Sequence, residues 1–140
     1  MVNARVEGKE LHSRLWWVII PLWGYAVAIS IGSAIPTAPP GPPWIPYFDK
    51  LEHIVEYGIL GALAARFALT SPHLWWRNFA WWLFPILIAV YGCLDELHQS
   101  FVPGRICSLG DWAADSIGGL LGILVMLFWG RTRLSPKSFA

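Results

Sequence analysis

Apolar residues occur along the chain in four long runs that are separated by short polar segments. The runs cover residues 15–35, 51–69, 75–94 and 112–129. Each is close to the roughly 20 residues that an α-helix needs to cross a hydrocarbon core of about 30 Å. A helix also satisfies its own backbone hydrogen bonds, as a spanning segment must. The pattern therefore predicts an all-α membrane protein, a bundle of four transmembrane helices.

Composition supports a single polytopic membrane domain over residues 1–140. The chain is 56% hydrophobic and 14% charged, whereas a soluble domain carries about 25% charged residues. A formal net charge of +1 gives no basis for binding nucleic acid. The first run is longer than the roughly 7–15 apolar residues of a signal peptide, so we expect a retained helix.

The positions of the basic residues predict how the bundle is oriented. Of the ten Lys and Arg residues, only Lys50 and Arg105 lie in or beside the loops that follow the first and third runs. Because cytoplasmic flanks hold the excess of basic residues, both termini are predicted to be cytoplasmic. The two loops and the polar motifs beside them are then extracytoplasmic. The first of these loops is rich in proline, which favours a stiff, extended connection.

The second run opens with ionisable side chains on one helical face. Asp49, His53 and Glu56 are spaced i, i+4 and i+7, and Tyr57 follows His53 by one turn. A local alternative is a capping box formed by Asp49 and Glu52. That alternative does not explain His53 or Glu56, which lie deeper in the helix.

The third and fourth runs carry similar groups at the same end. Asp95, His98 and Gln99 are spaced i, i+3 and i+4 and are predicted to share a face, while Glu96 points partly away. In the fourth run Ser108 and Asp111 match a capping box, whereas Asp115, one turn further, has no such role. An ionised acid at a helix centre costs about 2.5–3.5 kcal/mol on insertion scales. We therefore expect these groups to satisfy one another in a shared polar pocket, covered by a loop that turns at Pro103–Gly104 and carries Arg105.

Small residues recur every four positions and predict close helix packing below this layer. They are Gly24, Ala28 and Gly32 in the first run, Gly58 and Ala62 in the second, and Ala114, Gly118 and Gly122 in the fourth.

These blocks resemble the VanZ-like membrane protein family over residues 48–122. The matching blocks are Asp49-Lys50-x-x-His53 with Tyr57, then Asp95-Glu96-x-His98-Gln99 with Pro103-Gly104-Arg105, then Asp111 with Gly118 and Gly122. Asp115 and Glu56 depart from the family pattern and add acids to the pocket. The resemblance implies a multi-pass protein of the prokaryotic cell membrane, of the type associated with low-level resistance to the glycopeptide teicoplanin. It implies no settled reaction.

Three roles for the polar pocket follow from its residues. The first is an enzyme acting on an envelope lipid or cell-wall precursor, with His53 or His98 as general base and Asp95, Glu96 or Asp111 as its orienting partner. Lys50 and Arg105 would hold an anionic group. The second is binding of a lipid headgroup or a lipoglycopeptide without chemistry, and the third is a structural polar network. The remaining residues expected to line the pocket are Asp49, Glu56, Tyr57, Gln99 and Asp115.

Cofactors and disulfides are not required by the sequence. A His₂-carboxylate metal set is available in principle, but no close-spaced metal signature occurs, so the sequence predicts no metal site. Cys93 and Cys107 are too few for a disulfide framework and are predicted to be free thiols.

Overall fold

The residues that the structure describes form four α-helices and no strand. The structure is a computed structural model that describes residues 2–36, 42 and 44–133. The helices are α1 (Val2–Ser33), α2 (Phe48–Thr70), α3 (Leu74–Gln99) and α4 (Leu109–Arg133). The predicted all-α class is confirmed. Part of the proline-rich loop, residues 37–41 and 43, lies outside the described residues.

Three of the helices are long and apolar enough to cross a membrane. They contain the segments Trp16–Ser33, Leu74–Gln99 and Leu109–Gly130. These helices indicate a multi-pass membrane protein. α2 is 23 residues long, but it carries ionisable residues through its first turns and Arg66 near its end. A fourth crossing by α2 therefore stays a prediction.

The helix boundaries differ from the apolar runs in two informative places. α1 begins at Val2 rather than near residue 15, because a polar segment that contains no proline can continue a helix outward. α3 continues through Gln99, so the polar residues after residue 94 form its last turn. The capping box of Asp49 and Glu52, the local alternative for the start of α2, does not form. Tyr47, with φ of 58°, precedes the helix without a side-chain cap, and Asp49 lies within the first turn.

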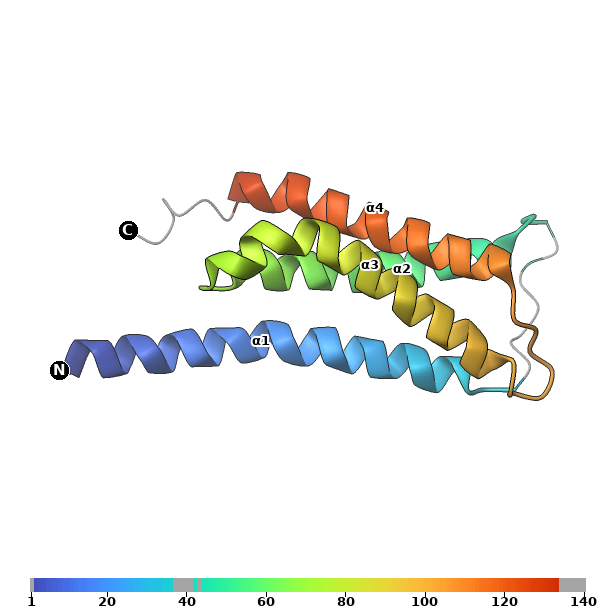
Figure 1. The fold of residues 1–140 in the computed structure, drawn as a ribbon, viewed down its shortest axis with the longest axis horizontal. Helices are drawn as coiled ribbons and strands as arrows, with labels where there is room; N and C mark the ends of the chain where they lie inside the picture. Colours follow the sequence, from blue (N-terminus) through green and yellow to red (C-terminus); the bar gives the residue numbers. More distant parts are fainter. Residues whose placement is uncertain (1, 37–41, 43, 134–140) are drawn as a thin grey trace.

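All the polar motifs meet at one end of the bundle (Figure 1). The end of α1, the start of α2, the end of α3 and the start of α4 lie together there, joined by the two longer connections. α2 and α4 run parallel, side by side. α3 changes direction along its length, and Pro85 lies within it. Proline removes a helical hydrogen bond and commonly bends a helix. The last turns of α3 thereby approach α1.

Glycines line the contact between α2 and α4, which we call the glycine seam: Gly58, Gly61, Gly118, Gly119 and Gly122. A Cβ atom at Gly122 would overlap the backbone of Gly58, and one at Gly118 would overlap the backbone of Ile54. Close packing through small residues is thus confirmed for these two helices. Gly61 and Gly119, which also lie in close backbone contact, were not in the predicted pattern.

The corresponding prediction for α1 is wrong. A Cβ atom at Gly24 or at Gly32 would meet nothing within 4 Å, and Ala28 is exposed. Small residues every four positions permit close approach, but another helix must face them for it to occur.

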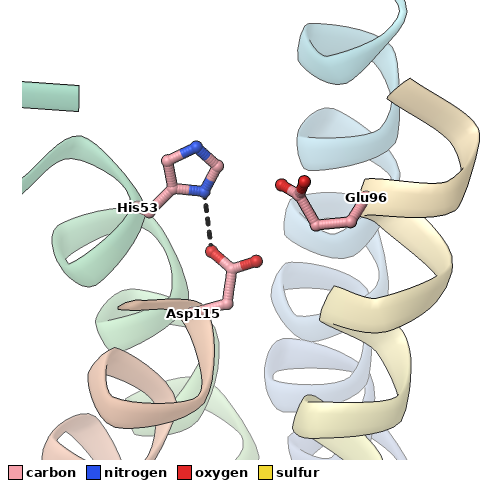
Figure 2. A group of neighbouring side chains, drawn as sticks. All are labelled: His53, Glu96 and Asp115. Carbon is pink, nitrogen blue, oxygen red and sulfur yellow. Dashed lines mark hydrogen bonds and ion pairs between the residues drawn. The ribbon is translucent and has the colours of Figure 1, made fainter. Parts of the chain in front are cut away.

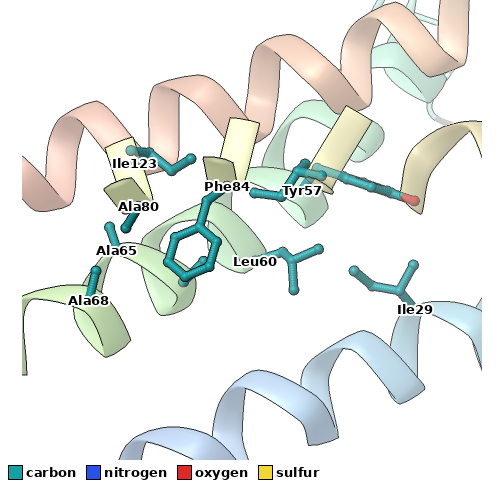
Figure 3. Packing of buried hydrophobic residues seen from close by; sticks show 10 residues of the cluster. Ile29, Tyr57, Leu60, Ala65, Ala68, Ala80, Phe84 and Ile123 are labelled. Carbon is teal, nitrogen blue, oxygen red and sulfur yellow. The ribbon is translucent and has the colours of Figure 1, made fainter. Parts of the chain in front are cut away.

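The apolar core lies below the polar end and uses small side chains (Figure 3). Leu60, Ala64, Ala65 and Ala68 of α2 pack with Phe84 of α3 and with neighbouring buried residues of α3 and α4. α1 reaches this core through Ile29, which is 1% exposed.

Polar contacts join α1 to α3. The hydroxyl groups of Ser30 and Tyr91 lie 2.8 Å apart, and Tyr91 donates a hydrogen bond to the backbone carbonyl of Ala26. One turn nearer the polar end, Ser33 donates to Asp95 at 2.7 Å. Hydrogen bonds between helices are a recognised means of association within membranes.

The Pro103–Gly104 turn is formed as predicted, and it provides a simple stability test. Arg105 N–H donates to the Val102 carbonyl, and Gly104 has φ of 82°.

Because an L-residue is strained at this φ, Gly104→Ala is expected to destabilise the protein by about 1 kcal/mol. Thermal unfolding in detergent measures this. Gly24→Ala is a suitable comparison because Gly24 has no positive φ and a Cβ atom there would meet nothing within 4 Å. An equal loss in both variants would contradict the explanation.

Candidate functional site

The centre of the polar end is a hydrogen-bonded pair between α2 and α4. His53 Nδ1 lies 2.8 Å from Asp115 Oδ1. The Asp115 side chain is fully buried and that of His53 is 15% exposed. The glycine seam lies directly below and holds the two helix backbones together. Asp115, predicted only to line the pocket, is therefore the carboxylate that orients His53.

Lys50 and Asp111 lie next to this pair, on its more exposed side. The Lys50 ammonium forms ion pairs with Asp111 and with Asp49. Both residues precede the predicted span of residues 51–69, so their charges lie outside the predicted hydrocarbon region. Hydrogen bonds to Asp111 and Asp49 raise the pKa of Lys50, and the hydrogen bond from Lys50 lowers the pKa of Asp49. Lys50 is thus a firmly charged group, and Asp111 Oδ1 lies 3.9 Å from His53 Nε2.

The predicted capping box at the start of α4 is half formed. The Ser108 hydroxyl accepts a hydrogen bond from Asp111 N–H at 3.3 Å. The reciprocal bond is replaced, because Ser108 N–H donates to Glu96 Oε2 at 2.6 Å. The Asp111 carboxylate is consequently available to Lys50.

Glu96 completes a group of three side chains that come from three helices. Figure 2 shows its carboxylate directed toward His53 and Asp115. One potential ligand atom from each of His53, Glu96 and Asp115 lies within 4.8 Å of the others. We call these three residues the central triad. Glu96 is 2% exposed, although its place in the sequence predicts a side chain that points partly away from this face.

His98 does not join this group, which corrects the predicted assignment. At about 100° per residue, Gln99 lies about 40° and Glu96 about 100° from Asp95 in one sense, while His98 lies about 60° away in the other. Asp95, Glu96 and Gln99 are buried and His98 is exposed. The i, i+3, i+4 spacing was compatible with two helix faces, and α3 buries the one that contains Glu96.

Three buried polar atoms near the centre have no hydrogen-bond partner within the described part of the chain. They are Glu96 Oε1, Asp115 Oδ2 and the Tyr57 hydroxyl. Asp115 Oδ2 lies against Gly92, where a Cβ atom would be 3.1 Å from it. Buried polar groups in proteins are nearly always paired. The groups that the structure describes therefore leave the network open.

Asp95 and Gln99 belong to a second polar group, which joins α3 to α1. Asp95 Oδ2 accepts hydrogen bonds from Ser33 and from the Gln99 amide at 2.7 Å and 3.1 Å. Asp95 was a predicted catalytic candidate, but its contacts are those of a helix-joining residue. Ser33 was not singled out from the sequence, since a lone serine at the end of an apolar run gives no signal.

Arg105 and Glu56 lie at the margins of the site. Arg105 donates to the backbone carbonyls of Ile35 and Gly32 at 3.3 Å and 3.5 Å, which caps the end of α1. It was predicted to cover the acids and hold an anion, whereas its guanidinium is engaged at α1. Glu56 is half-buried one turn below Glu52. Cys93 and Cys107 are free and exposed, in agreement with the prediction.

Fold and site together define a multi-pass helical membrane protein with a buried His-carboxylate site at one end of its bundle. The model of the VanZ/LLP1 family matches residues 9–130. The chain therefore belongs to the VanZ/LLP1 family. No curated protein and no solved structure matches it.

Proposed function

We propose that this protein binds or modifies the polar part of an envelope lipid, or of a cell-wall-related ligand, at the extracytoplasmic face of the prokaryotic cell membrane. By this activity it contributes to glycopeptide tolerance of the teicoplanin type. Membership of the VanZ/LLP1 family and the membrane-type helices support this proposal.

The observation that carries the proposal is the incomplete pairing of the polar centre. A network that served only to join helices would satisfy its buried groups internally. Here Glu96 Oε1 and Asp115 Oδ2 are buried without partners among the described residues. Buried polar groups without partners are found mainly at functional sites. We therefore favour a ligand-directed role over a purely structural one.

A catalytic form of the proposal is favoured by the geometry of His53. A general base needs a partner that orients its ring, and Asp115 bonds to Nδ1 at 2.8 Å. Nε2 lies on the side of the half-exposed Lys50. His53 would accept a proton there, and Lys50 would attract an anionic headgroup such as a lipid phosphate.

Tolerance to teicoplanin in an expressing bacterial host tests the function. His53→Ala and Asp115→Asn are each expected to abolish the gain in tolerance, because the first removes the imidazole and the second removes the negative charge beside it. His98→Gln is the matched control, since His98 is exposed and outside the central triad, and it is expected to keep full tolerance. Membrane accumulation of each variant is measured alongside. Retention of tolerance by accumulated His53→Ala protein would contradict the proposal.

The proposed topology has four crossings, both termini in the cytoplasm and the site outside. Cys107 is an exposed thiol in the loop beside the site. A membrane-impermeant maleimide applied to intact cells is therefore expected to label the protein, and Cys107→Ser is expected to remove most of the labelling. Labelling of Cys107 only after permeabilisation would place the site on the cytoplasmic side.

A further inference from the structure

The central triad has the donor set of a metal site. One imidazole and two carboxylates converge from α2, α3 and α4, with one potential ligand atom of each within 4.8 Å of the others. Ligands bound to one zinc ion at about 2.0–2.2 Å are separated by about 3–3.5 Å. Small side-chain rotations would bring the three ligand atoms from their present separation to that of bound ligands. The backbones already hold the three groups around one point.

The two partnerless carboxylate oxygens are an independent observation that indicates a ligand. Glu96 and Asp115 are 2% and 0% exposed. Glu96 Oε1 and Asp115 Oδ2 have no partner among the described residues, and the two carboxylates face each other (Figure 2). Two ionised carboxylates at this depth repel and are poorly solvated. A cation between them removes both penalties.

Charge and donor chemistry narrow the choice of cation. A divalent ion with two carboxylates and a neutral imidazole forms a neutral unit, which suits a buried position near a membrane. Imidazole suits Zn²⁺ and other first-row transition metals, while Mg²⁺ and Ca²⁺ prefer oxygen ligands alone. We propose that His53, Glu96 and Asp115 bind one divalent transition-metal ion, with Zn²⁺ as the fitting ion.

Asp111 occupies the place of a supporting partner in such a site. A metal-bound histidine usually directs its other ring nitrogen to a carboxylate or carbonyl oxygen. Asp111 Oδ1 lies 3.9 Å from His53 Nε2 and is held by Lys50. When His53 binds the ion through Nδ1, its Nε2–H is directed toward Asp111. No close-spaced metal signature occurs in the sequence, because the three ligands come from separate helices.

The inference deepens the proposed function, on whose site it rests: in the metal-bound form His53 is a ligand and not a general base. Metal binding can be measured without any tolerance assay. Full-length protein in detergent is stripped with a chelator, titrated with Zn²⁺ alone and assayed for bound metal after gel filtration. We expect one Zn²⁺ per chain and a higher unfolding temperature in its presence, because an ion that binds only the folded state stabilises it. Glu96→Gln should bind at least tenfold more weakly, and Asp111→Asn about 10–100-fold more weakly. His98→Gln should bind as the wild type does.

The outcomes separate the two proposals. Wild-type protein that neither retains Zn²⁺ nor is stabilised by it overturns the metal inference, even if no variant folds. Binding that is unchanged in Glu96→Gln also overturns it, and places any bound ion elsewhere. Zn²⁺ binding that needs Glu96, together with tolerance that survives loss of His53, supports the metal site and contradicts the proposed function. Tolerance that needs His53, in a protein that does not bind Zn²⁺, supports the proposed function and overturns the metal site.

Discussion

Gly122→Leu is expected to prevent the bundle from forming a stable folded protein. A Cβ atom at Gly122 would overlap the carbonyl group of Gly58, which is backbone and cannot rotate away. α2 and α4 would have to separate, and overpacking of this kind costs about 1–3 kcal/mol or more. We expect a loss at or above the upper end of that range. Size-exclusion profiles and thermal unfolding in detergent measure it.

Gly24→Leu is the matched control for this substitution. It makes the same chemical change in another membrane-type helix, at a position where a Cβ atom meets nothing within 4 Å. It should leave the unfolding temperature close to that of the wild type. Similar losses of unfolding temperature in Gly24→Leu and Gly122→Leu would mean that leucine is tolerated poorly in any of these helices. The glycine seam would then not be the cause of the loss in Gly122→Leu.

Asp95→Ala is expected to loosen α1 without removing the central triad. The substitution deletes the acceptor shared by Ser33 and Gln99, both of which are buried. A hydrogen bond to a charged group contributes about 1.5–3 kcal/mol. Local opening of α1 should become about 10–100-fold more frequent, since each 1.4 kcal/mol is a factor of about ten.

Hydrogen exchange of the α1 amides between Trp16 and Ser33 measures this opening. Leu94→Ala changes the neighbouring position, which is exposed, and should leave exchange of α1 unaltered. Faster exchange throughout the bundle, rather than in α1, would show that Asp95 supports the whole fold. Zn²⁺ binding by Asp95→Ala protein should remain, because Asp95 is not in the triad.

The helices could be predicted from the sequence because their signal is local. Apolar runs of spanning length and the Pro103–Gly104 turn each carry their own physical requirement. The start of α1 could not be predicted, since the polar residues before residue 15 neither favour nor forbid a helix strongly. The same holds for Tyr47, whose left-handed conformation has no sequence signal of its own.

The residues of the polar layer could be named from the sequence, but which of them meet at its centre could not. His53, Glu96, Asp111 and Asp115 were all identified as residues of one polar layer. Which of them touch depends on the rotation of each helix about its axis, and the rotation is set by packing. For α3 a rotation of a few tens of degrees decides between His98 and Glu96. The Ser33 contact depends on α1 lying beside α3, which no local pattern encodes.

The glycine seam has a consequence for how freely the site can adjust. Side chains at a helix interface can change rotamer and let two helices slide, but the seam is backbone against backbone. A slip of one helical turn would displace α4 by about 5.4 Å along α2 and carry Asp115 out of reach of His53. The spacing of the site's groups is therefore set by the main chain, so the site is preorganised before a ligand binds. The protein should discriminate among ligands by size and charge more sharply than an adaptable, side-chain-packed cleft would.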